Sequence, residues 1–170
     1  QAPIEVTLIS DGPKAFYSGM FPGYLTGRYS LEEISFEIEP YCSTLGVQFI
    51  NDHITDISPQ QKTVAGKKGK SYSYDILSIN VGSTANTRNL EIDSDSVSPV
   101  KPITKFHEDI QSLLKRQSQS SKPFRWVQIG GGAASVEVAI GLKKLFAKKD
   151  VPIEITLIES KSQLLATHNA

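Results

Sequence analysis

The most regular pattern of hydrophobic and polar positions lies in residues 124–159. Apolar side chains dominate 124–129 (FRWVQI) and again 153–158 (IEITLI), and these two short runs predict strands. Between them, residues 133–148 carry apolar side chains at the spacing of a helix. The order strand, helix, strand is the one that a right-handed βαβ crossover requires.

Two earlier regions also have a clear period. Residues 4–10 (IEVTLIS) alternate and are rich in β-branched side chains, which predicts a strand. From residue 103 onward the spacing of the apolar side chains predicts a helix, and these side chains are Ile103, Phe106, Ile110, Leu113 and Leu114. A polar stretch at 117–123 predicts a linker between that helix and the βαβ segment.

Between residues 11 and 46 the turn-forming residues are the main signal. Residues 11–27 are rich in glycine, proline and aromatic side chains, and they predict a long shaped loop. Ser30 and Glu33 have the spacing of a capping box. Pro40 is expected to open a short helix that ends near Gly46.

Residues 47–102 predict short strands and loops. Residues 47–58 predict a strand pair or one bent strand, and residues 62–75 predict a hairpin with a glycine-rich turn. Residues 74–83 (YDILSINVGS) predict an apolar strand, and residues 83–102 a polar loop. The whole pattern belongs to the α/β class.

Composition narrows the classes of function. The chain has 170 residues with 18 basic and 18 acidic side chains, so its charge gives no electrostatic basis for a nucleic-acid partner. Cys42 is the only cysteine, which excludes a disulfide framework and a CxxC dithiol, and the histidines have no ligand spacing, so no metal site is expected. We see neither a transmembrane run nor a signal peptide, and we expect a cytoplasmic setting.

The turn after residue 129 is the strongest candidate for a binding site. Residues 130–135 (GGGAAS) follow a predicted strand, open a predicted helix and approach the dinucleotide pattern G-x-G-x-x-G/A. Gly130 permits the sharp exit from the strand, and Gly132 allows a pyrophosphate to approach the backbone and the free N–H groups at the helix N-terminus. Gly131 and Ala133 belong to the same expected cofactor-binding turn. Ser135 stands where the pattern has glycine or alanine. The competing interpretation is a tight structural corner without a ligand.

Glu159 strengthens the dinucleotide interpretation, because it ends the second strand of the βαβ segment. An acid in that place accepts hydrogen bonds from the ribose hydroxyls and repels a 2′-phosphate, which favours NAD(H) over NADP(H). The first predicted strand also runs into an acid, Asp11 (VTLISD). By analogy, residue 1 would lie inside a second dinucleotide-binding domain, past its first strand, glycine turn and helix; the alternative is an ordinary strand followed by a β-turn.

Several motifs, in this order along the chain, resemble one family. They are VTLISDGPKAFYSGMFPGYLTGRYSLEEI, YDILSINVGS, VKPITKF and VQIGGGAASVEVA. Together they are similar to the FAD/NAD(P)-binding pyridine nucleotide-disulfide oxidoreductase superfamily, and within it to the type II NADH dehydrogenase-like branch. The stretch YSGMFPG is most similar to the flavoprotein module fused to selenophosphate synthase in some proteins.

The resemblance implies a partial fold with two dinucleotide-binding domains. Residues 1–102 would form an incomplete FAD-binding domain with a β-meander, and residues 103–123 a connecting helix and linker. Residues 124–170 would form the first βαβ unit of a Rossmann-like NAD(H)-binding domain. The chain would then be an internal fragment without the first FAD fingerprint and without the segment that returns to the flavin.

The resemblance also implies roles for individual residues toward FAD. Asp11 would face the adenosine ribose, with the family's acid at the neighbouring position of Ser10. The flavin ring would lie against Tyr17, Ser18, Gly19 and Met20, unless that stretch is a surface Ω-loop. The remaining positions are His53 and Ile54, whose backbone would meet the adenine, and Val81, Gly82 and Ser83, which would close over the pyrophosphate. The imidazole of His53 has a surface or structural role as its alternative.

Glu137 matches the family's glutamate after the second glycine turn, which approaches the nicotinamide and the flavin; its alternative is a favourable acid near a helix N-terminus. The implied activity is ping-pong transfer of a hydride from NADH to FAD and then to a small-molecule acceptor, with a quinone favoured. Membrane association of a longer protein stays undetermined. The alternatives are a non-catalytic nucleotide-binding or regulatory module, and a plain Rossmann domain with an unrelated N-terminal half.

Overall fold

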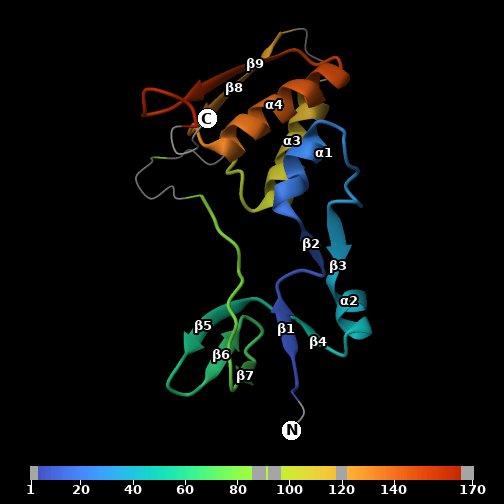
Figure 1. Ribbon diagram of the computed structural model, residues 1–170, viewed down its shortest axis with the longest axis vertical. Coiled ribbons are helices and arrows are strands. Elements are labelled where there is room, and N and C mark those ends of the chain that lie inside the picture. Colours follow the sequence, from blue (N-terminus) through green and yellow to red (C-terminus); the bar gives the residue numbers. More distant parts are fainter. Residues whose placement is uncertain (1–3, 86–90, 92–96, 118–121, 166–170) are drawn as a thin grey trace. The chain divides into compact units, whose positions relative to one another are not determined.

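The computed structural model describes residues 4–85, 91, 97–117 and 122–165 (Figure 1). The chain forms two compact units, one of residues 1–16 and 35–82 and the other of residues 17–34 and 83–170. Each unit has its own secondary structure and its own buried side chains, and each is described by itself. The assignment of residues 1–102 and 124–170 to two cofactor-binding domains stays a prediction.

The second unit is built on the βαβ segment that the sequence predicts. Its strands are parallel neighbours in register from Phe124↔Ile153 to Ile129↔Ile158. Figure 1 shows α4 running along this strand pair, with α1 and α3 next to it. The elements of the unit are η1 (Ser18–Met20), α1 (Phe21–Leu25), α3 (Ile103–Gln117), β8 (Phe124–Ile129), α4 (Ala133–Lys148) and β9 (Ile153–Ile158).

The core of this unit lies between α1, α3, α4 and the strand pair. Phe106, Leu142 and Phe146 have no exposed surface, and the Phe21 ring packs tilted by 51° against the Phe106 ring, with 5.8 Å between their centroids. Full burial of such a side chain contributes about 1.5–3 kcal/mol, so these few contacts hold α1 and α3 to α4. Gly141 of α4 allows α1 to come close, because a Cβ there would lie 2.7 Å from Leu25 Cβ.

The first unit combines a parallel strand pair with an antiparallel meander. Strands β1 and β4 run parallel from Thr7↔Gln48 to Ser10↔Asn51, and β5, β6 and β7 form an antiparallel sheet in that order. The elements of the unit are β1 (Thr7–Ser10), β2 (Lys14–Phe16), β3 (Ser35–Glu37), α2 (Ile38–Thr44), β4 (Gln48–Asn51), β5 (Ile54–Ser58), β6 (Thr63–Gly66) and β7 (Ser71–Ser73).

Most elements appear where the sequence pattern places them. The helix at 103, the whole βαβ segment and the hairpin of β6 and β7 are confirmed. Residues 47–58 are a pair of strands that belong to two different sheets. Helix α2 begins at Ile38, two residues before Pro40, and ends next to Gly46, whose φ of +66° is typical of a helix C-terminus.

Two expectations about the secondary structure of residues 4–27 are corrected. The strand expected at 4–10 starts only at Thr7, because its partner β4 begins at Gln48. The segment 11–27 is not one loop: it contains β2, η1 and α1, and α1 forms because Phe21 and Leu25 are each only 1% exposed. Tertiary burial thus overrides the turn-forming composition of that segment.

The apolar strand expected at 74–83 is wrong. The segment forms no strand, and Ile76 and Val81 are 91% and 87% exposed. A strand needs a neighbour for its backbone hydrogen bonds, and no strand in the described part of the chain pairs with this segment. Ser30 and Glu33 do exchange capping-box hydrogen bonds of 2.7 and 3.2 Å, but a turn and β3 follow them.

Candidate functional site

The glycine turn joins the end of β8 to the start of α4. Gly130 has a φ of +105°, which a side chain would disfavour, and its N–H donates to the Ile158 carbonyl at 2.8 Å. Gly132 is the N-cap of α4 with extended backbone angles and no side-chain cap. A Cβ at Gly132 would meet nothing within 4 Å, so the N-terminal end of α4 is open there. The site therefore offers backbone N–H groups and the positive end of a long helix to an anion.

Glu159 is tied directly to this turn. Its carboxylate accepts hydrogen bonds from the Gly131 N–H at 2.6 Å, the Lys161 N–H at 3.0 Å and the Ser160 hydroxyl at 3.0 Å. The bonds from the backbone N–H groups of Lys161 and Gly131, together with that from Ser160, hold the pKa of Glu159 below its ordinary value. The carboxylate is therefore ionised at neutral pH and placed beside the glycine turn.

The middle glycine of the turn has no room for a side chain. A Cβ at Gly131 would lie 2.6 Å from Glu159 Oε2 and 2.8 Å from Leu164 Cδ2. The Leu165 N–H also donates to the Gly131 carbonyl at 2.7 Å. The segment after β9 thus folds back over the turn and fixes both the N–H and the carbonyl of Gly131.

Ser135 stands at the third small position of the dinucleotide pattern, where its hydroxyl is buried. Among the described residues the buried Ser135 hydroxyl has no hydrogen-bond partner. The Ser135 carbonyl accepts from the buried Gln128 side chain at 3.0 Å, and Gln128 lies 3.3 Å from the Trp126 indole N–H. Serine fits this close helix–strand contact sterically, but its hydroxyl stays unsatisfied.

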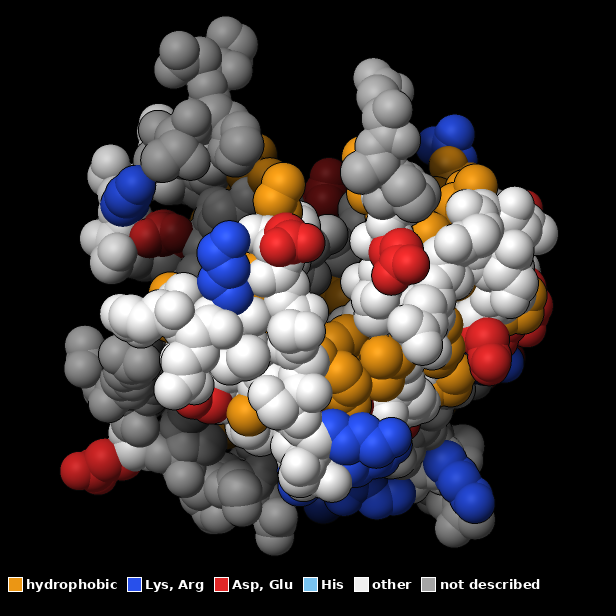
Figure 2. Space-filling view, turned by 90° about the horizontal axis from the view of Figure 1, so that it is seen from below, with side chains coloured by type: hydrophobic (Ala, Val, Ile, Leu, Met, Phe, Trp, Pro, Cys, Tyr) orange, Lys and Arg blue, Asp and Glu red, His pale blue; other side chains and the backbone are white. Residues whose placement is uncertain are grey.

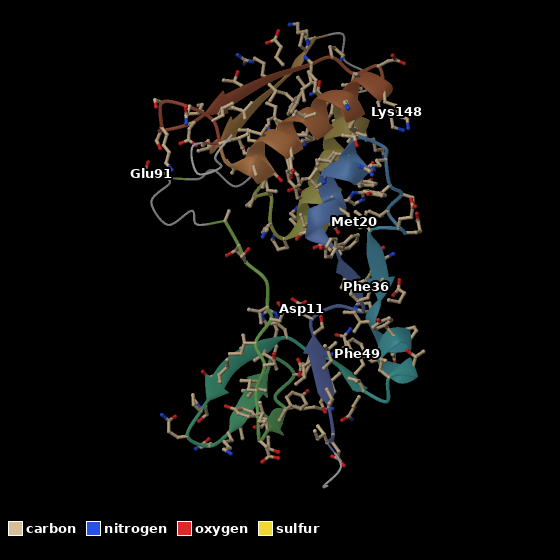
Figure 3. All side chains as sticks on the ribbon, viewed as in Figure 1. Asp11, Met20, Phe36, Phe49, Glu91 and Lys148 are labelled. Carbon is tan, nitrogen blue, oxygen red and sulfur yellow. The ribbon has the colours of Figure 1, made fainter. Side chains whose placement is uncertain are left out.

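The expected adenosine edge lies at the carboxyl ends of β1 and β4. Figure 3 shows Asp11 just beyond the end of β1. Its carboxylate lies 3.3 Å from His53 Nδ1, and both side chains are exposed. Ile54 follows as the first residue of β5 and is half-buried. Three of the residues named for the adenosine end are thus neighbours at one strand edge, which is where ligands of parallel sheets bind.

The residues expected at the flavin ring form a short turn in the second unit. Tyr17, Ser18 and Gly19 are exposed, and Figure 3 shows Met20 where η1 passes into α1. The Met20 N–H donates to the Tyr17 carbonyl at 3.0 Å, and the Tyr17 ring packs against Gly19. The turn is well defined locally. It belongs to a different compact unit from Asp11 and His53, so the structure gives no distance between the two sets.

The other candidate residues are exposed. Val81 and Gly82 lie in the segment 74–83, which forms no strand, and Gly82 has a φ of +73°. Ser83 accepts a hydrogen bond of 2.8 Å from the Lys101 ammonium. Glu137 lies on α4, one turn beyond the glycine turn, and points to the surface. Their roles toward a cofactor stay predictions.

One residue that the sequence analysis did not single out is Asp52. It is 2% exposed, follows β4 directly and precedes His53. A buried carboxylate is uncommon and needs hydrogen-bond partners, but a lone Asp between two short strands gives no such signal in the sequence. Its neighbours are described below.

Neither a group of metal ligands nor a membrane-spanning helix is found among the described residues. In the part of the chain that the structure describes, no three His, Cys, Asp or Glu side chains are grouped closely enough for a metal ion. No helix among those residues has both the length and the apolar content to cross a membrane. Hydrophobic side chains nevertheless reach the surface next to basic ones, as Figure 2 shows for one face.

Comparison with known proteins agrees with this architecture. The sequence profile described as pyridine nucleotide-disulphide oxidoreductase matches residues 1–170. A sulfide-quinone reductase of Aquifex aeolicus (strain VF5) is 34% identical over 79 residues, which cover 46% of this chain and 18% of that protein. The match therefore spans less than a fifth of the relative's length.

Solved structures show the same fold. The sulfide:quinone oxidoreductase of Aquifex aeolicus has a TM-score of 0.61 at 24% identity, and the similarity covers 92% of this chain and 37% of that one. An NAD-dependent persulfide reductase from A. fulgidus has a TM-score of 0.71 at 20% identity, covering 95% of this chain and 30% of that one. The one family profile matches both halves of the chain, so the alternative of a Rossmann domain with an unrelated N-terminal half is wrong.

Proposed function

The chain belongs to the pyridine nucleotide-disulphide oxidoreductase family, and on that premise we propose that it is part of a longer FAD-dependent oxidoreductase that oxidises NADH. The observation that carries the proposal is the glycine turn with Glu159 hydrogen-bonded to Gly131. It would supply the anion-binding helix end and the ribose-binding acid of a dinucleotide site within one compact unit.

The residues at this turn fit a bound NADH. Gly132 leaves space for the pyrophosphate at the N-terminus of α4, where backbone N–H groups face a negative charge. A carboxylate has about four acceptor sites, so Glu159 retains one for a ribose hydroxyl beside its three hydrogen bonds. Its negative charge repels the 2′-phosphate of NADPH, so we propose NADH as the substrate.

The adenosine end of FAD fits the edge formed by Asp11 and His53, and the backbone of Ile54 adds to it. Residues 17–20 and 81–83 are proposed to meet the flavin ring and the pyrophosphate, and Glu137 the nicotinamide. When bound, FAD accepts the hydride and passes electrons on. The residues named here would bind and orient the two cofactors.

We also propose the family's domain layout for this chain: a flavin domain in residues 1–102, a connection in 103–123 and the NADH domain in 124–170. The exposed side chains of Val127, Ile129 and Ile158 on β8 and β9 support the assignment of these strands to a larger NADH domain. Parallel sheets in complete α/β domains are covered on both faces, so we propose that other elements of the longer protein cover this face.

The finer assignment rests on the sequence motifs. We propose the NADH dehydrogenase-like branch, with a module similar to the one fused to selenophosphate synthase, and a quinone as the acceptor. The protein would work in the cytoplasm and meet a membrane quinone as a peripheral protein.

The test uses the longer protein, purified with FAD and mixed with NADH without oxygen. We expect the oxidised flavin absorption to bleach, and a Gly132→Ala variant to keep its flavin but to bleach far more slowly. A protein that binds NADH but neither holds nor reduces FAD is a nucleotide-binding module and contradicts the proposal.

A further inference from the structure

A sharp corner separates the parallel strand pair of the first unit from its meander. Strand β4 ends at Asn51 and β5 begins at Ile54, so only Asp52 and His53 carry the chain from one sheet to the other. The Asp52 N–H still donates to the Ser10 carbonyl of β1 at 3.0 Å. Asp52 is thus the last residue tied to the strand pair at its carboxyl edge.

The Asp52 side chain ties this corner to the meander. Its Oδ1 accepts from the His53 N–H at 2.8 Å and, at a longer 3.4 Å, from the Lys68 N–H in the turn between β6 and β7. Its Oδ2 accepts from the Tyr72 hydroxyl of β7 at 2.8 Å. One carboxylate therefore contacts the backbone of the corner, the hairpin turn and a strand of the second sheet.

The surroundings of the carboxylate are built to receive it. Gly66 of β6 lies directly against it, and a Cβ at Gly66 would overlap the carboxylate oxygens. The hairpin turn adds two bonds around the corner, from the Lys67 N–H to the His53 carbonyl at 2.8 Å and from the Lys68 ammonium to the Asn51 carbonyl at 2.6 Å. The backbone of His53 is therefore held at both its N–H and its carbonyl.

The Asp52 carboxyl is ionised despite its burial. Burial alone would raise its pKa, but the hydrogen bonds from Tyr72, His53 and Lys68 outweigh that effect and leave the pKa below its ordinary value. An ionised, nearly buried acceptor binds N–H and O–H donors more strongly than a neutral one. The corner is consequently held by charge-assisted bonds.

This arrangement holds the backbone from which the His53 side chain extends. The imidazole reaches Asp11 at the end of β1, and the two groups form the edge that we propose for the adenosine end of FAD. We propose that Asp52 is the positioning residue of that edge, which sets the His53 backbone and ring for adenosine through its own buried hydrogen bonds. The inference rests on the proposed function, because it concerns the same cofactor site.

The test is made on the longer protein, purified and stripped of its FAD, by residue-resolved NMR, with ADP as the probe because it carries the adenosine and diphosphate of the cofactor. Shifts at Asp11, His53 and Lys68 report this edge, and shifts at Gly131 and Gly132 report the NADH site separately. We expect ADP to shift both sets in the wild type.

Asp52→Asn preserves the shape of the side chain but removes its charge and one acceptor. We expect ADP affinity at the Asp11–His53 edge to fall by roughly ten-fold or more, with affinity at the glycine turn unchanged. The amide protons of His53 and Lys68 should lose protection from hydrogen exchange. Asp56→Asn, which makes the same charge change at an exposed position of β5, is the matched control and should change neither.

Tyr72→Phe separates positioning from mere stability. It removes one hydroxyl next to Asp52 and should weaken ADP binding by a smaller factor in molecules that are still fully folded. In the double variant with Asp52→Asn and Tyr72→Phe, the fold-loss of ADP affinity should be smaller than the product of the two single fold-losses, because both substitutions act through one carboxylate. A structural role would lower the melting temperature without changing ADP affinity in the folded protein.

The outcomes distinguish the two proposals. If the wild type binds ADP at the Asp11–His53 edge and Asp52→Asn binds it equally well, the positioning role is overturned and the cofactor site stands. If ADP shifts nothing at that edge in the wild type, the adenosine site is wrong and the role of Asp52 is overturned with it.

Discussion

Two strand pairs in the described part of the chain are parallel, β1–β4 and β8–β9, and each runs into an acid at its carboxyl edge. Glu159 accepts hydrogen bonds from main-chain N–H groups, including that of the glycine turn. Asp11 is exposed and faces the exposed ring of His53 at 3.3 Å. The same strand–acid pattern therefore produces a fixed carboxylate in one unit and a loosely held one in the other.

The difference lies in what surrounds each strand pair. The β8–β9 pair carries its own crossover helix, so the glycine turn, α4 and Glu159 form one connected structure. At the β1–β4 edge the ordering comes from the meander through Asp52 and Tyr72, and not through Asp11 itself. The position of an acid at a strand end is therefore fixed by the backbone around it in one unit, while in the other unit only the neighbouring Asp52 is anchored.

The largest expected effect breaks the ordered edge at Gly131. A Gly131→Ala variant places a Cβ 2.6 Å from Glu159 Oε2 and 2.8 Å from Leu164 Cδ2, and such overpacking costs about 1–3 kcal/mol. Thermal or urea unfolding should show this loss, together with loss of NADH binding.

Gly132→Ala is the matched control, because its Cβ would meet nothing within 4 Å and the backbone there is extended. Its stability should fall by only about 0.5–1 kcal/mol, which is the loss expected when alanine, a poorer N-cap residue, replaces glycine without a steric clash. NADH binding should still fall, because the methyl group occupies the space of the pyrophosphate. Equal stability of the Gly131 and Gly132 variants would contradict the tight packing described for Gly131.

The second effect concerns the charge of Glu159. Glu159→Gln keeps the length of the side chain but loses the negative charge, so NADH affinity should fall by about ten-fold. NADPH affinity should fall less or rise, because the repulsion of its 2′-phosphate is removed. Titration with both nucleotides measures the ratio of their affinities, and an unchanged ratio would show that Glu159 does not select NADH.

A smaller effect appears in acid. The folded-state pKa values of Glu159 and Asp52 lie below their ordinary values of 4.5 and 3.8, so the folded chain binds fewer protons there than the unfolded chain. Their stabilisation is present above those values and is lost as the pH falls through the folded-state pKa values. The free energy of unfolding, measured from neutral pH to below pH 3.8, should fall as the pH falls, and it should fall less steeply with pH in Glu159→Gln and Asp52→Asn. A dependence on pH as steep as that of the wild type in both variants would exclude these carboxylates as the cause.

The smallest effect is expected at Asp11. Exposed ion pairs contribute little, so Asp11→Asn should change the free energy of unfolding by less than about 0.5 kcal/mol. A larger loss by urea unfolding would mean that the two strand edges are more alike than the structure shows.

The sequence predicts the ordered region better than the other one. The βαβ segment is local, so its period and its glycines suffice for β8, α4, β9 and the approach of Glu159 to the turn. The first unit depends on contacts between distant segments. The β1–β4 pairing, the β2–β3 pairing and the Asp52–Tyr72 bond join residues far apart in the chain, and no local pattern records them. The error at 74–83 has the same origin, because a strand-like sequence does not supply its own partner.

The most direct test of the central claim is NADH binding to the 170-residue chain. Trp126, the only tryptophan, lies on β8 in the same unit as the glycine turn and serves as an energy-transfer donor to bound nicotinamide. We predict that excitation of Trp126 gives nicotinamide emission that saturates as NADH is added. NAD⁺ should reduce this emission by displacing NADH, and the emission should be much weaker in the Gly132→Ala variant. Emission that does not saturate, or that is the same in the Gly132→Ala variant, would contradict a dinucleotide site at this turn.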